Sequence, residues 1–349
     1  MADNEDMLDP DLLRDLEAAR GSPASILMRR HFQEIQRHRN ETAARRSVMT
    51  PVQRRRDQAR DVIASAEFKH EDRYHLHSVL ALCGLPYRRP PDDAVDYVRE
   101  YGRNSLVIQA GYLKDPRTGK MVRQGLPYGP KARLLMLHIC TMALRQNSSE
   151  IELAESMSAF IRDLGFPVTG GDRGTINIFK EQLHRLAAAR MQLGLWNGER
   201  STTINSQPIE AFDLWLTQDP HQKILWSTKL HLDQKFFDTL KEHALPVDIR
   251  AIRSFANSAK QIDIILWLSY RLRTVERPYE LRWKVLHDQF GSVVTRVRRF
   301  KESFREDLGA IMEVFPKLPV KLTEKGLCLM PCDVNALFVA PKPSLPSKG

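Results

Sequence analysis

Residues 281–331 constrain the fold of this chain more than any other part of its sequence. A strand pattern and a short helical segment end at Gly291, where the glycine interrupts the apolar periodicity. A longer helix pattern then runs from Ser292 to about Val314, and a β-hairpin pattern follows at 320–329. Helix, turn, helix and hairpin in this order is the layout of a winged helix, a fold that presents its second helix to DNA.

The long helix pattern has one apolar face and one cationic face. At a period of about 3.6 residues its apolar side chains share a stripe, which consists of Val293, Val297, Phe300, Phe304, Leu308, Ile311 and Phe315. An arginine on the other face can donate two hydrogen bonds to guanine, a contact worth about 1–3 kcal/mol of base discrimination. The residues expected to contact DNA from this helix are Ser292, Thr295, Arg296, Arg298, Arg299 and Arg305. The hydroxyl of Ser292 is also expected to cap the helix start.

A cationic helix face is often only a solvated surface, and the hairpin favours DNA contact over that alternative. Lys321 and Lys325 lie on either side of its turn, and Gly326 is predicted to have a positive φ. Lysines at this place are expected to contact phosphates, which would add affinity without sequence preference.

The composition favours a polyanionic partner. The 349 residues carry a net charge of +10, with a pI of about 9.5. Four scattered cysteines predict neither a disulfide framework nor a zinc site, so reduced thiols, a cytoplasmic location and no metal or cofactor are expected. No apolar run approaches the roughly 20 residues of a membrane span, and the acidic start does not resemble a signal peptide.

The patterns predict a mostly helical α+β protein with two tandem winged-helix domains. Residues 1–70 are interpreted as a flexible arm, acidic at first and then arginine-rich, either solvated or in contact with nucleic acid. The first winged helix is placed at 71–217 and the second at 218–335. A polar, proline-rich tail at 336–349 is expected to be disordered.

The two predicted recognition helices differ in charge. The helix pattern of the first domain, from Thr175 to about Met191, has no cluster of cations on its outer face. We expect this domain to support DNA binding through Arg173, Asn177, Lys180 and Arg185. Its nearly neutral surface also makes it a candidate for self-association. The second domain is expected to read most of the bases.

Several stretches resemble one protein family. They are Leu126–Arg133, Phe160–Gly165, Thr169–Thr175, Ser227–Leu230 and Ile262–Leu272, and they resemble the plasmid-encoded RepA replication initiators over roughly 75–335. The resemblance implies tandem winged helices that bind direct repeats (iterons) in double-stranded origin DNA, open the duplex and help to load host replication proteins. It also implies a homodimer in equilibrium with the monomer, with the first domain at the dimer interface.

Other classes of function compete with a non-enzymatic initiator. His75-Leu76-His77 has the metal-ligand spacing of a relaxase, but the preceding residues predict a helix start instead of the central strand that a relaxase needs. The segment 118–121 contains a Gly-Lys pair, but Lys114 stands where a P-loop requires glycine. A plain transcriptional repressor would share the DNA-binding mode without opening the duplex.

Overall fold

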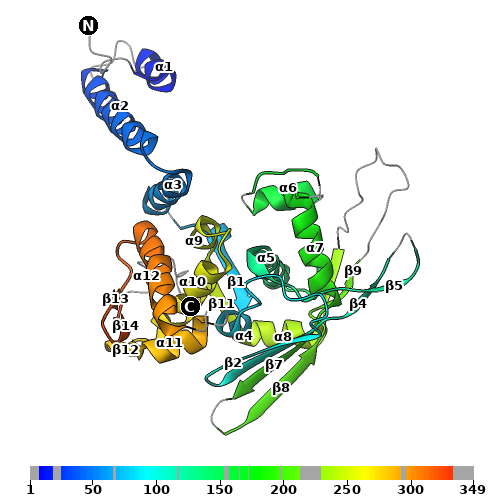
Figure 1. Cartoon of the computed structure of the whole chain (residues 1–349). Helices are drawn as coiled ribbons and strands as arrows, with labels where there is room; N and C mark the ends of the chain where they lie inside the picture. Colours follow the sequence, from blue (N-terminus) through cyan, green and yellow to red (C-terminus); the bar gives the residue numbers. More distant parts are fainter. Residues whose placement is uncertain are drawn as a thin grey trace, which may run out of the picture. The chain divides into compact units, whose positions relative to one another are not determined.

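The computed structural model describes residues 8–18, 25–65, 68–115, 118–152, 157–164, 166–171, 173–196, 199–212, 229–291 and 296–332. The chain divides into two compact units, residues 1–61 and 62–349 (Figure 1). Helices predominate over several small antiparallel sheets, which confirms the predicted α+β, mostly helical class. In the described part of the chain no helix is both long and apolar enough to cross a membrane.

The first unit is helical where the sequence predicted a flexible arm. It contains α1 (Pro10–Ala18), α2 (Ser25–Ser47) and the start of α3 (Pro51–Ser65). Apolar side chains at helical spacing on α1 and α2 form a small core, which consists of Leu8, Leu12 and Phe32 with Leu16, Met28 and Ile35 packed against it. This apolar contact gives the segment a fold of its own despite its high charge.

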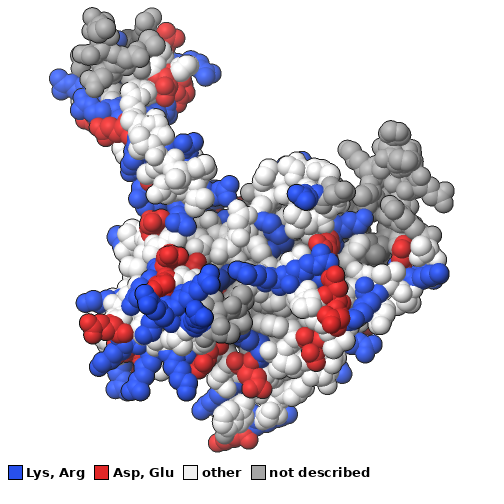
Figure 2. Space-filling model, in the orientation of Figure 1, with Lys and Arg blue, Asp and Glu red and all other residues white. Residues whose placement is uncertain are grey.

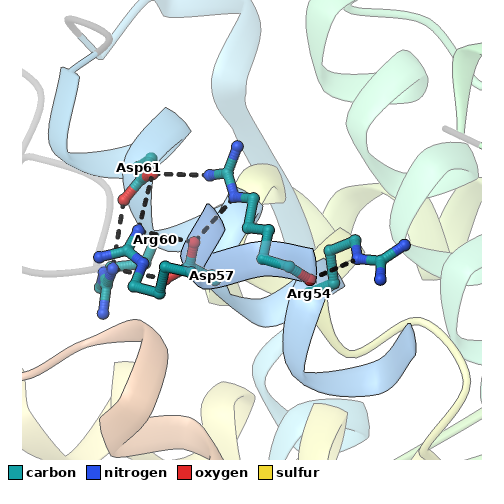
Figure 3. A network of polar contacts seen from close by, with 6 residues as sticks. Arg54, Asp57, Arg60 and Asp61 are labelled. Carbon is teal, nitrogen blue, oxygen red and sulfur yellow. Dashed lines mark hydrogen bonds and ion pairs between the residues drawn. The ribbon is translucent and has the colours of Figure 1, made fainter. Parts of the chain in front are cut away.

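A carboxylate–arginine network joins α2 to α3 (Figure 3). Asp57, buried among these side chains, accepts hydrogen bonds from Arg45 at 2.8 Å, Arg46 at 2.9 Å and Arg60 at 2.6 Å. Asp61 accepts a further bond from Arg46 at 2.7 Å. These arginines are therefore occupied within the unit, although the sequence shows them only as part of a cationic run.

The second unit contains the end of α3 and most of the regular structure. Its other helices are α4 (Ser78–Cys83), α5 (Gly129–Gln146), α6 (Met157–Asp163), α7 (Thr175–Ala188), α8 (Gln234–His243), α9 (Ile249–Ser254), α10 (Ala259–Arg271), α11 (Trp283–Phe290) and α12 (Val297–Val314), with 3-10 turns at His70–Asp72 and Leu272–Thr274. Its strands are β1 (Arg73–His77), β2 (Asp96–Tyr101), β3 (Asn104–Gln109), β4 (Tyr112–Lys114), β5 (Met121–Arg123), β6 (Glu150–Glu152), β7 (Arg190–Trp196), β8 (Ser201–Ser206), β9 (Ile209–Phe212), β10 (Lys229–Leu232), β11 (Ala244–Asp248), β12 (Tyr279–Arg282), β13 (Val320–Leu322) and β14 (Gly326–Leu329). Within the described residues the sheets have the strand orders β1-β11, β6-β10-β9, β12-β14-β13, β2-β3-β7-β8 and β4-β5.

Two of these sheets join strands from both predicted winged-helix domains. β1 pairs with β11, so that Arg73 lies opposite Asp248. β6 pairs with β10, so that Ile151 lies opposite Leu230. The predicted boundary between 217 and 218 lies outside the described residues, but the segments on either side of it complete each other's sheets.

A buried ion pair also connects the two halves of this unit. Arg133 on α5 donates to both carboxylate oxygens of Asp263 on α10, at 2.6 and 2.7 Å. Its Nη1 donates to the carbonyl oxygens of Pro86 at 3.2 Å and Gly129 at 2.9 Å. Because the pair is buried, each of these partners offsets part of the desolvation of the two charges. The pair thereby fixes α5 against α10.

The elements predicted around 279–329 are present in the predicted order. α10, β12, α11, α12, β13 and β14 follow one another, and β14 lies between β12 and β13. The buried apolar side chains of this part include Trp267, Leu281, Leu286, Phe290, Phe300, Phe304, Leu308, Ile311, Val314, Leu327 and Leu329. Edge-to-face contacts of Trp267 with Phe290 and of Trp283 with Phe304 join the helices.

Candidate nucleic-acid interface

The start of α12 differs from the sequence prediction. The helix begins at Val297, and Arg296 is its N-cap residue in an extended conformation with no side-chain cap. The prediction that Ser292 caps this helix was therefore wrong, because the helix begins five residues later. Ser292 and Thr295 lie outside the described residues, so their DNA contacts stay predictions.

The apolar stripe of α12 is confirmed except at its start. Phe300, Phe304, Leu308 and Ile311 are buried with no measurable exposure, as their spacing predicted. Val297 was predicted to share that stripe, but its side chain is 45% exposed. It lies in the first turn of the helix, at the exposed end of the stripe.

Exposed cations occupy the first turns of α12. The side chain of Arg298 is 93% exposed and forms a 3.3 Å ion pair with Glu302. Arg296 and Arg299 are exposed as well. An exposed pair one helical turn apart contributes only about 0.3–0.5 kcal/mol, so Arg298 is easily released to another anion. The helix thus presents three arginines at the end that a recognition helix points into the groove.

Trp283 positions the β13–β14 hairpin against α12. Its backbone N–H donates to the carbonyl oxygen of Lys325 at 3.0 Å, and its indole Nε1 donates to the carbonyl oxygen of Glu324 at 2.8 Å. On the other side, Lys301 and Arg305 lie 5.6 and 5.0 Å from the centroid of its ring. One buried aromatic residue therefore holds the hairpin turn and two cations of α12 in a fixed relation.

The hairpin turn itself presents Lys321 and Lys325, both exposed. Thr323 fixes the turn by donating to Glu280 at 2.7 Å and accepting from the backbone N–H of Gly326 at 3.0 Å. The φ of Gly326 is +159°, so the predicted positive φ is confirmed, and packing also requires glycine here. A Cβ there would stand 1.8 Å from the carbonyl oxygen of Leu281.

Lysine and arginine side chains gather on the side of this unit that carries α11, α12 and the β12–β14 sheet, at the lower left of Figure 2. The exposed cations of these elements are Arg282, Lys284, Arg296, Arg298, Arg299, Arg305, Lys321 and Lys325. Six acidic residues of the same elements are also exposed, namely Glu280, Asp288, Glu302, Glu306, Glu313 and Glu324, so the positive charge of this surface is interrupted by negative charge. It suits a partner that carries regularly spaced negative charge.

Of the side chains predicted to contact DNA from the first domain, only some are exposed to solvent. Arg173 is exposed just before α7, and Lys180 is half-buried. Asn177 is exposed, but its amide donates to the carbonyl oxygen of Gly171 at 2.9 Å and so stabilises the preceding loop. Threonine side chains tighten that loop further, because the backbone N–H groups of Thr169 and Thr175 each donate to the other's hydroxyl at 2.9 Å.

Arg185 does not face solvent as predicted. It is 7% exposed, donates to the carbonyl oxygen of Leu126 at 3.0 Å and pairs with Glu181 at 2.8 Å. Its guanidinium also lies 5.1 Å from the centroid of the Tyr128 ring. Helical periodicity could not have shown this, because its partners at 126–128 lie nearly sixty residues away along the chain.

His75 and His77 lie on strand β1, which begins at Arg73. The helix start predicted for the preceding residues 71–74 was therefore wrong, because the chain forms only a 3-10 turn at His70–Asp72 before the strand. Burial lowers the pKa of His75 to about 4 and that of His77 to about 3. The Nδ1 atom of His77 accepts a hydrogen bond from the backbone N–H of Val79 at 3.2 Å, which caps α4. Among the described residues there is no group of three or more His, Cys, Asp or Glu side chains that could hold a metal ion.

Comparison with known proteins identifies a solved structure and a family model that are similar to this chain. The crystal structure of domain 2 and domain 3 of RctB aligns with 74% of this chain and 100% of its own, with a TM-score of 0.47 and 10% identity. No protein with a curated description matches the chain. A family model for the plasmid-encoded RepA protein matches residues 126–284. This segment, just under half of the chain, confirms over its length the resemblance to the plasmid-encoded RepA family.

Proposed function

We propose that this protein is a non-enzymatic initiator of plasmid replication that binds repeated sites in double-stranded origin DNA. The observation that carries the proposal is the joint placement of two cationic elements. Arg298 and Arg299 stand at the exposed start of α12, and Trp283 fixes the lysine-bearing hairpin beside that helix. The family match over 126–284 supports the assignment to replication.

In the proposed mode the part of the chain from α10 to β14 acts as a winged helix. The first turns of α12 enter the major groove, where arginine recognises guanine. Lys321 and Lys325 contact the flanking phosphates and add salt-dependent affinity. Binding at neighbouring repeats then strains the duplex, and the opened strands admit host replication proteins. A homodimer in equilibrium with the monomer would set how many molecules are free to bind.

The test uses the full-length protein and supercoiled DNA that carries the region flanking its gene. We expect protected direct repeats spaced by about two helical turns, on the order of 20 base pairs. Permanganate should react with thymines beside the repeats only when protein is present. The variant Arg298→Gln/Arg299→Gln should lose the protection, and Arg190→Gln, an exposed arginine on β7, should retain it.

Two outcomes would favour the alternatives. Protection without permanganate reactivity would favour a transcriptional repressor. Strand cleavage that depends on Mg²⁺ or Mn²⁺ would favour a relaxase. A relaxase also needs a nucleophilic tyrosine, and Tyr74, next to His75, would then be the first residue to replace by Phe.

A further inference from the structure

The β4–β5 hairpin, residues 111–124, is a two-stranded ribbon that the sequence did not predict. Its two strands pair with each other and with no further strand in the described chain. Hydrogen bonds from Asp115 N to Lys120 O and from Gln124 N to Gly111 O, both at 2.8 Å, close its outer end and its base. Such a ribbon is only marginally stable by itself, so the protein must anchor it.

The ribbon is anchored beside α7. A Cβ at Gly111 would lie 2.0 Å from the carbonyl oxygen of Ala188, so the backbones touch at the end of that helix. Arg123 donates to the carbonyl oxygen of Ala94 at 2.8 Å. At Gly125 a Cβ would lie 2.3 Å from Nη1 of Arg185. The buried guanidinium therefore packs directly against the backbone at the base of the ribbon. The predicted DNA contact Arg185 is thus a positioning residue for the ribbon.

One face of the ribbon combines apolar and cationic side chains. Tyr112 lies opposite Arg123, and Lys114 lies opposite Met121. Directly opposed residues of an antiparallel pair share a face, so all four side chains are on the same side. Tyr112 is 57% exposed and Met121 is 62% exposed. Lys114 is exposed on this face, and Lys120, which directly precedes β5, is exposed at the outer end of the ribbon.

This face fits a DNA groove better than a protein strand. The major groove admits a two-stranded β-ribbon, in which apolar side chains can contact thymine methyl groups. Lysines on an exposed strand oppose edge-to-edge pairing with another chain. The outer face of α7 offers little cationic charge, since Arg185 is buried and Lys180 is half-buried. The ribbon, with Lys114 and Lys120 both exposed, presents more exposed lysines than α7 does.

We infer that the β4–β5 ribbon is a second DNA-binding element, which enters a groove with Tyr112 and Met121 against the bases and with Lys114 and Lys120 on phosphates. The inference rests on the proposed DNA-binding function and extends it to the first predicted domain. It also gives a role to the Gly-Lys pair at 119–120, which does not fit a nucleotide-binding loop.

The experiment compares full-length variants on the DNA that the wild-type protein protects. For Lys114→Gln/Lys120→Gln, the slope of log K against log salt should become shallower by about 1.8, since each phosphate contact contributes about 0.9. Hydroxyl-radical protection should disappear on one flank of the site and persist at its centre. The matched control is Lys229→Gln/Lys241→Gln, which removes two exposed lysines elsewhere and should leave the slope unchanged.

A second variant tests the apolar contact. Tyr112→Ser should weaken binding roughly tenfold, the lower end of an apolar or polar base contact, without changing the salt slope. All of these side chains are exposed, so thermal unfolding of the variants should match that of the wild type.

The outcomes separate the two proposals. If Lys321→Gln/Lys325→Gln makes the slope shallower and the ribbon variants do not, the ribbon inference is overturned while the proposed function stands. A ribbon variant that binds DNA normally but shifts the self-association equilibrium in sedimentation would also overturn it, in favour of a protein contact. A wild-type protein without DNA binding would overturn both.

Discussion

The indole Nε1 of Trp283 donates a hydrogen bond to the carbonyl oxygen of Glu324 across 2.8 Å. Glu324 lies at the turn of the β13–β14 hairpin, and Trp283 begins α11, so the bond joins two elements that are about forty residues apart. The same ring lies against Arg305 of α12. The position of the hairpin relative to α12 therefore depends on this tryptophan.

Trp283→Phe should loosen the hairpin without unfolding the protein. The substitution leaves the carbonyl of Glu324 without this donor, and we expect the free energy of unfolding to fall by about 1 kcal/mol in urea denaturation. DNA binding should become less salt-dependent, because the hairpin lysines are no longer held near phosphates. Trp267→Phe is the matched control, since that indole donates to Tyr101 at 3.1 Å. It should lower stability and leave the salt slope alone; an identical salt slope for both variants would contradict the role of Trp283.

Arg299→Ala should affect base recognition. We expect specific binding to weaken by about 1–3 kcal/mol and one base position in the site to become degenerate, because a bidentate arginine–guanine contact is lost. Selection from a randomised library of sites, followed by titration, would measure both effects. Equal losses on specific and random DNA would show that Arg299 contacts only the backbone.

Lys325→Ala should affect phosphate contact. Binding should weaken by similar factors on every DNA sequence, and the slope of log K against log salt should become shallower by about 0.9. Titrations at several salt concentrations would measure this. A slope equal to that of the wild type would remove the hairpin from the interface.

Asp263→Ala should strongly destabilise the fold. It leaves the buried guanidinium of Arg133 without its carboxylate, and removing one partner of a buried ion pair costs about 3–5 kcal/mol. Urea denaturation should show this loss. In the double variant Arg133→Met/Asp263→Leu no unpaired charge remains, so its loss should be smaller than the sum of the losses of the single variants Arg133→Met and Asp263→Leu. Additive losses would indicate that the two side chains act independently.

Acid should destabilise the protein through its buried histidines. Burial lowers the pKa of His75 and His138 to about 4 and that of His77 to about 3. The unfolded chain binds these protons near pH 6.5, whereas the folded chain excludes them until about pH 4. The free energy of unfolding should therefore fall between about pH 6.5 and pH 4, by up to about 1.4 kcal/mol per pH unit for each histidine.

Denaturation at several pH values would measure this dependence. His138→Leu should make it shallower, and His231→Gln, whose side chain is 46% exposed, should not. A wild-type protein of constant stability across this range would contradict the burial of these rings as neutral groups.

Long helices with a regular apolar pattern were predictable from the sequence, whereas several strands and the exact start of α12 were not. The stripe from Phe300 to Ile311 follows directly from helical spacing, and the helix predicted from Thr175 to about Met191 runs from Thr175 to Ala188. Strands β4 and β5 were missed because each has only three residues, and β2 and β3 were missed because polar or exposed side chains interrupt their apolar pattern. The start of α12 was placed too early because Ser292 looked like a cap.

Site residues were predictable only where exposure follows from local spacing. Arg298 and Arg299 are exposed on α12 as predicted. The burial of Arg185 was not predictable, because it depends on contacts with Leu126 and Tyr128 that form only in the folded chain. In the same way, the arginine run at 45–60 looked uniform, although Asp57 neutralises part of it.

The pairing of β1 with β11 has a consequence for biosynthesis. Residues 73–77 leave the ribosome long before residues 244–248, and β1 has no other strand partner in the described structure. The early half of this unit therefore cannot complete its core during translation until the later half has been made. Contacts this far apart in sequence slow folding, and the waiting strand is exposed to other nascent chains. We expect chaperone dependence to peak just before residue 248 emerges.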